Sequence, residues 1–306
     1  MVSETLCPPE EERDRNIASM EAYENCDDDD GSPGGGRGEV IANDDPRGEY
    51  TYGEFPLESF DLLVDRALDF VQQEEEGPII EGSNHDTATA SKNHRTMVDL
   101  GSGCGRLVFY AALTRGGGEE VEPSSKSTTE PTTKLWNVHG IEIGMRLHSL
   151  AVNSLQRGIQ RGWFESADIS RSEKDESSNG SSPIIAFHNG NALLMDDPYY
   201  AHTQEDQNSS QHSAIRSLLS ETDLLFAYST VWETNPARPF DPELGAMMLS
   251  PKWSETLASL CPDGCVAVTT DRALDPENGW RLLDRMDVEN PSVWGSVGYI
   301  SKLEKK

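Results

Sequence analysis

A glycine-rich segment between an apolar run and a helix-forming run constrains the fold of this chain more than any other feature. The segment reads Val98-Asp99-Leu100-Gly101-Ser102-Gly103-Cys104-Gly105-Arg106, and it completes the apolar, strand-like run of residues 96–100. Glycines after a strand let the backbone turn sharply and approach a ligand, and the helix that follows offers unpaired N–H groups to an anion. Doubly wound α/β folds bind their ligands at this edge of the sheet.

The rest of the chain alternates apolar runs typical of strands with amphipathic runs typical of helices. An amphipathic helix is predicted from Leu57 to Val71. Strands are predicted at residues 96–100, 136–143, 184–188, 224–228, 265–270, 280–288 and 297–303, and further helices at 104–114, 145–160 and 247–260. The pattern predicts the α/β class, with a doubly wound, mostly parallel, seven-stranded Rossmann-like sheet. The last two strands are expected to form a closing antiparallel hairpin, because the segment between them is too short for a crossover helix.

Polar segments divide the chain into an arm and a folded domain. Residues 1–46 are rich in Glu, Asp, Gly and Pro, and we expect them to form a disordered acidic arm. Residues 47–306 are expected to form one domain, with polar insertions near 116–134, 170–182 and 200–213. Insertions between elements cost little stability, so they are compatible with one continuous sheet.

The charge balance narrows the partners. The chain has 25 Lys and Arg against 54 Asp and Glu, a formal net charge of −29. This balance argues against direct nucleic-acid binding, which needs a basic surface, and it suits a basic protein partner such as a histone. The five cysteines fit neither a disulfide framework nor a zinc site, and no metal cluster is evident. With neither a signal peptide nor a membrane span in the sequence, we expect an intracellular protein of the nucleus or cytoplasm.

The spacing of the glycines and two carboxylates indicate the ligand. Gly101, Gly103 and Gly105 form G-x-G-x-G, whereas dinucleotide-binding loops have G-x-G-x-x-G. Asp99 would repel a pyrophosphate but suits an ammonium group. S-adenosylmethionine (SAM) carries both an ammonium and a carboxylate, so we expect Asp99 to face the ammonium and the loop N–H groups to face the carboxylate. Glu142, at the end of the second strand, is expected to accept hydrogen bonds from ribose hydroxyls. The structural alternatives are a helix-capping Asp99 and a solvated Glu142.

These residues, in this order, resemble the class I, seven-strand SAM-dependent methyltransferases from about residue 50 to the end. The segment Glu49-Tyr50-Thr51-Tyr52-Gly53-Glu54-Phe55 is similar to the Tyr-Gly-Glu segment of the non-SET histone-lysine methyltransferases, the disruptor-of-telomeric-silencing family. That resemblance implies that Tyr52, Gly53 and Glu54 fold over the cofactor. The chain departs from the family after the third strand, where Asn191 takes the place of an acid and would bind the adenine amine. It departs again after the fourth strand, at Tyr228-Ser229-Thr230-Val231-Trp232, and it has no evident basic nucleosome-binding segment.

The resemblance implies methyl transfer to a protein lysine, with a histone as one possible substrate. Tyr52, Tyr228 and Trp232 are then the candidate catalytic residues, lining an aromatic channel that desolvates the lysine; the alternative for Tyr228 and Trp232 is simple packing at the sheet edge. His188 is either a base or structural. Two other functions stay open: a small-molecule methyltransferase with the Tyr52 segment as a lid, and a non-catalytic SAM-fold protein that binds a partner. An NAD-dependent oxidoreductase is disfavoured by the loop spacing.

Overall fold

The computed structural model describes residues 55–73, 94–116, 135–164, 184–194, 208–230, 232–291 and 295–305. The strands are β1 (His94–Leu100), β2 (Leu135–Glu142), β3 (Ile185–Asn189), β4 (Leu224–Ala227), β5 (Phe240–Asp241), β6 (Ala246–Met247), β7 (Val266–Thr270), β8 (Trp280–Val288) and β9 (Ser296–Leu303). The helices are α3 (Leu57–Gln73), α4 (Arg106–Arg115), α5 (Met145–Gln160), α7 (Asn208–Ser220) and α8 (Pro251–Leu260), with short 3-10 turns η3 (Ala192–Leu194) and η4 (Pro276–Asn278). The arm at 1–46, residues 117–134 of the first insertion and the insertion at 170–182 lie outside the described residues.

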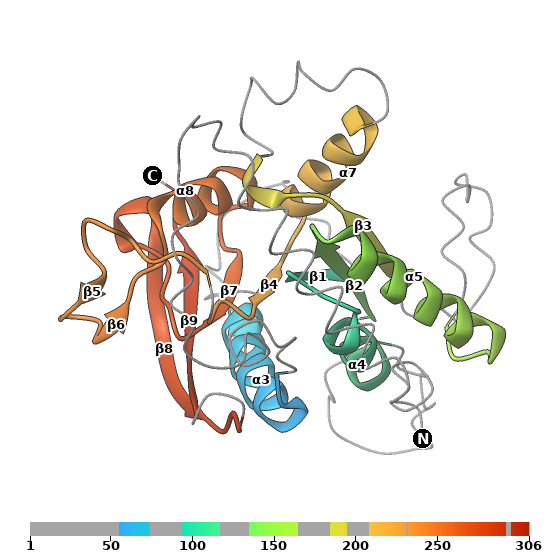
Figure 1. Cartoon of the computed structure of the whole chain (residues 1–306). Helices are drawn as coiled ribbons and strands as arrows, with labels where there is room; N and C mark the ends of the chain where they lie inside the picture. Colours follow the sequence, from blue (N-terminus) through green and yellow to red (C-terminus); the bar gives the residue numbers. More distant parts are fainter. Residues whose placement is uncertain are drawn as a thin grey trace, which may run out of the picture.

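Seven strands form one sheet in the order β3-β2-β1-β4-β7-β9-β8. The five strands from β3 to β7 are parallel, and β9 runs antiparallel to both β7 and β8. The chain moves outward in one direction from β1 through β2 to β3 and then returns to β4 on the other side of β1 (Figure 1). The strand order therefore reverses between β1 and β4, and both the predicted fold class and the closing hairpin are confirmed.

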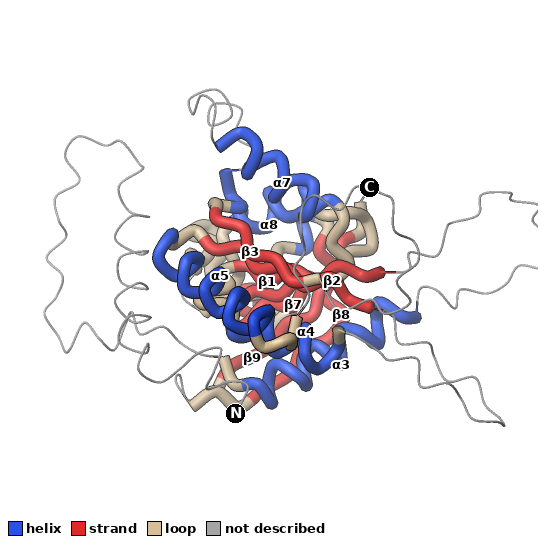
Figure 2. The backbone as a smooth tube through the Cα atoms, turned by 90° about the vertical axis from the view of Figure 1, so that its right-hand side faces the viewer, coloured by secondary structure: helices blue, strands red, loops and turns tan. Residues whose placement is uncertain are grey.

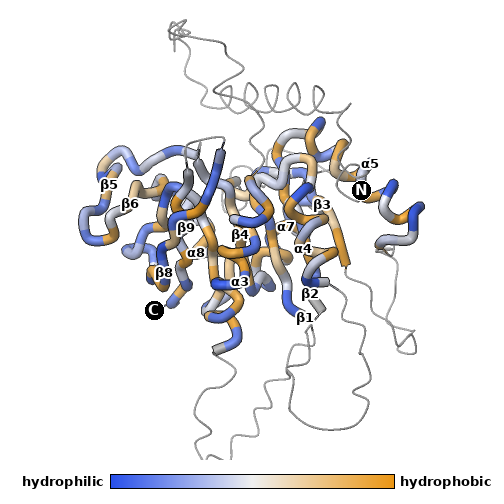
Figure 3. The backbone as a smooth tube through the Cα atoms, turned by 90° about the horizontal axis from the view of Figure 1, so that it is seen from below, coloured by the Kyte–Doolittle hydropathy of each residue, from blue (hydrophilic) through white to orange (hydrophobic). Residues whose placement is uncertain are grey.

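Helices cover both faces of this sheet (Figure 2). On one face, α3, α4 and α5 pack over an aromatic core whose centre includes Phe60, Phe109 and Phe226. On the other face, α7 and α8 pack over a mostly aliphatic core that also contains the buried Trp280. Figure 3 shows hydrophobic and hydrophilic stretches alternating along α3 and α5, as expected for helices that bury one side only.

Two features between β3 and β8 differ from the predicted elements. Helix α7 was not predicted: it begins at Asn208, within the polar stretch near 200–213, and continues beyond it to place Ile215 and Leu219 in the core. The helix predicted from Met247 begins instead at Pro251, because proline at the first helical position and Ser250 before it define the start. Residues 246–247 belong to the two-stranded ribbon β5–β6, which Figure 1 shows beside β8.

Candidate functional site

The glycine loop connects β1 to α4 and is held against the end of β2. The N–H groups of Gly101 and Ser102 both donate to the carbonyl oxygen of Ile141, at 2.9 and 3.1 Å. Gly105 adopts a left-handed φ of 84°, and a Cβ there would lie 2.4 Å from the ring of Phe187. Only glycine satisfies both conditions, so the loop can pass directly over the β3 side chain and start α4.

Two carboxyl groups are buried beneath this loop. Asp99 pairs with Gly140 across β1 and β2, two residues before Glu142, so both acids point to the same face of the sheet. Their side chains are almost inaccessible, with residue exposures of 2% for Asp99 and 5% for Glu142. The sequence prediction that the two acids meet at the ends of neighbouring strands is therefore supported by the geometry.

The two carboxyls differ in their hydrogen bonds. Glu142 accepts a hydrogen bond from the Gly103 N–H at 2.8 Å and another from the Gly144 N–H at 2.7 Å, one on each oxygen. Within the described residues, the Asp99 carboxyl has no hydrogen-bond donor from the protein. Glu142 therefore ties the glycine loop to the start of α5, whereas Asp99 is available to a ligand donor.

Burial sets the protonation of this pair. Burial raises the pKa of Asp99 well above its usual value, and the adjacent charge of Glu142 raises it further. Burial also raises the pKa of Glu142, although the N–H groups of Gly144 and Gly103 oppose that rise. A buried carboxyl in such surroundings favours binding of a cation, because the positive charge stabilises its ionised form.

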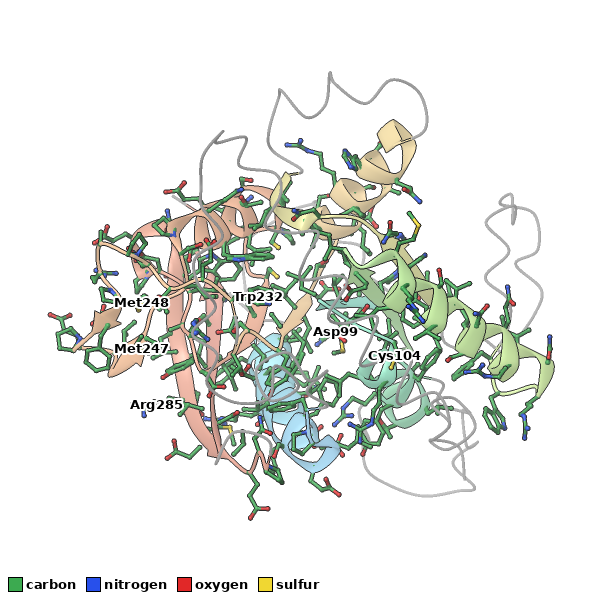
Figure 4. The ribbon with its side chains drawn as sticks, viewed as in Figure 1. Asp99, Cys104, Trp232, Met247, Met248 and Arg285 are labelled. Atoms are coloured by element: carbon green, nitrogen blue, oxygen red, sulfur yellow. The ribbon has the colours of Figure 1, made fainter. Side chains whose placement is uncertain are left out.

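The segment after β4 brings Tyr228 and Trp232 to the same edge of the sheet. Tyr228 is half-buried, and its hydroxyl oxygen accepts a hydrogen bond from the side chain of Asn290 at 3.0 Å. The Trp232 ring stacks on Trp253 of α8, with ring centroids 3.9 Å apart, and lies beside Gly101. Figure 4 labels Trp232 and Asp99 in the central part of the molecule.

The predicted Tyr52-Gly53-Glu54 segment lies outside the described residues, but the residue that follows it is well placed. Phe55 is buried, its ring centroid lies 5.2 Å from that of Tyr228, and its carbonyl oxygen accepts a hydrogen bond from Arg106 at 3.2 Å. Phe55 is thus fixed between the start of α4 and the end of β4. The covering role of residues 52–54 stays a prediction.

The loop after β3 supports the backbone around Glu142. The Asn189 side-chain amide donates to the carbonyl oxygens of Glu142 and Ile143, at 2.9 and 3.2 Å. Asn191, the predicted adenine ligand, accepts a hydrogen bond from the Leu193 N–H at 2.9 Å and so starts a short 3-10 turn. Its amide group stays at the sheet edge, and its contact with adenine stays a prediction.

His188, a candidate base, instead forms a ring pair with His139 of β2. The two rings stack with centroids 5.4 Å apart, and Nδ1 of His139 lies 3.2 Å from Nε2 of His188. Burial, with the neighbouring His188, lowers the pKa of His139 to about 4. Burial also lowers the pKa of His188, and the charge of His148 adds to the effect. The pair is thus neutral at physiological pH, and its geometry supports the structural interpretation.

Sequence reasoning missed a polar network that joins the end of β7 to the terminal hairpin. Asp271, at a left-handed φ of 61°, accepts hydrogen bonds from Thr230, Ser296 and the Val297 N–H. Asn290 bridges Ser296 and the Tyr228 hydroxyl. Asp and Asn are the residues that best tolerate such a backbone, but no sequence spacing identifies partners from strands so far apart. The network fixes Tyr228 relative to the hairpin.

In the described ranges, no group of three or more His, Cys, Asp or Glu residues is arranged to hold a metal ion. Among the helices of those ranges, none is long and apolar enough to cross a membrane.

No protein-family model and no curated protein matches the chain. Several solved structures do. An RNA methyltransferase from Salinibacter ruber, in complex with S-adenosyl-L-homocysteine, is 17% identical with a TM-score of 0.36, over 80% of this chain and 92% of that one. Magnesium protoporphyrin IX methyltransferase from Synechocystis PCC 6803, with bound SAM, is 10% identical with a TM-score of 0.36, over 80% of each chain. TrmN from Thermus thermophilus is 15% identical with a TM-score of 0.36, over 78% of this chain and 48% of that one.

The sheet itself defines the class of fold. The order β3-β2-β1-β4-β7-β9-β8, with its antiparallel last hairpin, is that of the Rossmann-like, class I methyltransferase fold. At these identities and TM-scores, the solved structures assign neither a reaction nor a substrate to this chain. None of the three is described as acting on a protein lysine.

Proposed function

We propose that this protein binds SAM at the carboxyl edge of the sheet between β1 and β4 and transfers its methyl group. The observation that carries this proposal is the convergence of Asp99 and Glu142 beneath a glycine loop at the point where the strand order reverses. Ligands of such folds bind at that point. A buried acid without a donor among the described residues suits the ammonium of an amino acid, and a second acid beside it suits the hydroxyls of a nucleoside.

Each acid has a distinct role in this proposal. Asp99 binds the ammonium group of the methionine part. Glu142 uses one acceptor site per oxygen on Gly103 and Gly144, so its remaining lone pairs accept the ribose hydroxyls. Gly101, exposed at the tip of the loop, allows the chain to approach the ligand without a side chain between them. SAM supplies a methyl group on a positively charged sulfur, and loss of that methyl leaves a neutral thioether.

The protein contributes positioning to this reaction. Tyr228 is held by Phe55 on one side and Asn290 on another, so its ring has one orientation at the edge of the site. An acceptor held in line with the methyl group by such a side chain reacts as in an intramolecular reaction. Positioning of this kind lowers the activation barrier by roughly 7–11 kcal/mol at best. A lysine acceptor must arrive neutral, and contact with aromatic side chains favours the neutral amine by excluding water.

For the acceptor, we propose a lysine side chain of a basic protein. The net charge of −29 supports this choice, because an acidic surface attracts a basic substrate and repels polyanions. The similarity of residues 49–55 to the Tyr-Gly-Glu segment of the histone-lysine methyltransferases is a second support. A small-molecule acceptor and a binding function without catalysis are the alternatives that the following experiment separates.

The experiment is transfer of a radiolabelled methyl group from SAM with three acceptor preparations: core histones, nucleosomes and a protein-free metabolite extract. The proposal predicts label on lysine in the histone samples, and much less label at sub-saturating SAM when Glu142→Ala replaces the wild type. Label only in the metabolite extract would overturn the lysine assignment. Tight SAM binding without label in any sample would favour the binding function instead.

A further inference from the structure

Two tryptophans form a stacked pair beside the glycine loop. The rings of Trp232 and Trp253 are 3.9 Å apart between centroids and inclined by only 16°. A Cβ built at Gly101 would lie 3.8 Å from Cζ2 of Trp232, which is ordinary contact distance. The indole of Trp232 therefore lies beside the first glycine of the loop, with space for one methyl group between Gly101 and the ring.

The tryptophan pair lies at the point where the strand order reverses. Gly101 follows β1 and Trp232 follows β4, and these neighbouring strands are the two between which the order changes. Trp253 belongs to α8 and supports the Trp232 ring from behind, with both residues only half-buried. Trp232 thus lines the edge at which the methionine part of the proposed cofactor lies.

Among the described residues, no arginine is a partner of the tryptophan pair. Arginines lie over the rings of Phe70, Phe60, Trp163 and Tyr299, but in the ranges that the structure describes none lies over Trp232. The face of an indole attracts positive charge more strongly than any other side-chain ring. Trp253 covers one face of the Trp232 ring, and no arginine of the described ranges lies over the other face, which is therefore open to a ligand cation.

We propose that Trp232, supported by Trp253, recognises the positive charge of the cofactor's sulfonium and so holds SAM more tightly than its demethylated product. This inference rests on the proposed function and extends it by assigning a charge-reading residue. SAM and S-adenosyl-L-homocysteine share the ammonium, the carboxylate, the ribose and the adenine. They differ in one methyl group and in the charge on sulfur. In the proposed site, Asp99 and Glu142 meet identical groups in both ligands, so any preference for SAM comes from a residue near the sulfur.

The consequence for turnover is a built-in release of the product. Once the methyl group has left, the sulfur is neutral and its attraction to the Trp232 ring is lost. The product then dissociates faster than SAM, so a fresh SAM molecule competes successfully for the site. A purely packing role for Trp232 would affect both ligands alike, which distinguishes the two explanations.

Titration calorimetry of the full chain with three ligands tests the proposal. The ligands are SAM, S-adenosyl-L-homocysteine and sinefungin, an analogue with a charged amine in place of the sulfonium. We expect Trp232→Leu to weaken the binding of SAM and of sinefungin by about threefold to tenfold, in line with a partly exposed cation–π contact. The affinity for S-adenosyl-L-homocysteine should change by less than about twofold. Trp253→Leu should give a smaller loss of the same selectivity, because it removes only the support of the ring.

The matched control is Trp163→Leu, which makes the same substitution in a half-buried tryptophan next to α5, where Arg161 lies over the ring. This variant should leave the ratio of the affinities for SAM and for S-adenosyl-L-homocysteine unchanged. If Trp232→Leu does not fold, Trp232→Phe decides the question, since it keeps an aromatic face with a weaker attraction and should lower the ratio partway.

Two results would be decisive against the inference. An unchanged ratio in the folded Trp232 variants, or equal losses for all three ligands, would show that Trp232 only shapes the site. A wild-type chain that binds none of the three ligands would instead overturn the proposed function. The two failures are therefore separated by the wild-type titration.

Discussion

Asp99 and Glu142 end two neighbouring parallel strands and point to the same face of the sheet, but only Glu142 receives backbone N–H donors. Glu142 is thereby part of the folded framework, since it fixes the glycine loop. Asp99 carries the cost of burial without compensation from the described residues. Such uncompensated polar groups are typical of sites whose partner is a ligand.

Asp99→Asn should stabilise the ligand-free protein at neutral and alkaline pH. The folded-state pKa of Asp99 is raised, so its burial costs nothing below the unfolded pKa and destabilises the protein as pH rises through the folded value. Chemical denaturation at pH 4 and pH 8 measures the effect. We expect near-equal stabilities at pH 4 and a more stable variant at pH 8, because the variant buries no charge at this position. A variant less stable at both pH values would contradict this account.

Binding of SAM should release protons. Burial raises the pKa of Asp99 in the free protein, and the ammonium group lowers it again in the complex, so Asp99 carboxyls that are protonated before binding ionise on binding. Calorimetry in two buffers of different ionisation enthalpy, repeated across the acidic to neutral range, should give different apparent binding enthalpies that indicate release. The difference should vanish in Asp99→Asn. Equal enthalpies in both buffers for the wild type would show that Asp99 does not meet the ammonium.

Gly140→Ala should displace the glycine loop. A Cβ at this position would lie 2.5 Å from the Ser102 hydroxyl oxygen and 2.7 Å from the Phe187 ring. Overpacking of this kind costs about 1–3 kcal/mol, and the shifted loop should also bind SAM more weakly. The control is Gly162→Ala, where the space is open but φ is 72°. It should lose only about 1–2 kcal/mol from backbone strain and keep its SAM affinity.

The His139–His188 pair should make the protein sensitive to acid. The folded pKa of His139 is about 4, below its usual value of 6.5, because the fold buries the neutral ring. The stability that depends on neutral His139 is therefore fully present above pH 6.5 and is lost as pH falls toward 4. The loss from this group is about 3 kcal/mol at most. We expect His139→Gln to flatten the dependence of unfolding free energy on pH between 7 and 4. The same slope in both proteins would exclude His139 as its origin.

The fold was predictable where the hydrophobic period was regular. The strand at residues 96–100 and the helix beginning at Leu57 appear as predicted, because dense apolar runs and an amphipathic period leave few alternatives. The helix α7 was missed because its first turns are polar; of its side chains from 211 onward, those of Ile215 and Leu219 are the fully buried ones. The start of α8 was misplaced because Met247 and Met248 continue the apolar pattern backward past Pro251, although they belong to the ribbon and the bridge beside it.

The site residues that could be predicted are those whose positions follow from the pattern of strands and loops in the sequence. Asp99, the three glycines and Glu142 lie at strand ends, so their positions follow from the strand pattern. Phe55, Trp253 and Asn290 reach the site through tertiary contacts with Tyr228 or Trp232, which leave no periodic trace in the sequence. The exposed side chain of Ile143, next to Glu142, is a further member of this edge that only the structure identifies.

Titration of SAM into the wild-type chain and into Glu142→Ala tests the central claim most directly, with Glu221→Ala, at an exposed position next to α7, as the control. The account predicts saturable binding of one SAM per chain to the wild type and to the control. It predicts at least about a tenfold loss, or about 1.4 kcal/mol, in Glu142→Ala. Equal affinity in all three proteins, or no saturable binding to the wild type, would contradict the proposed SAM site.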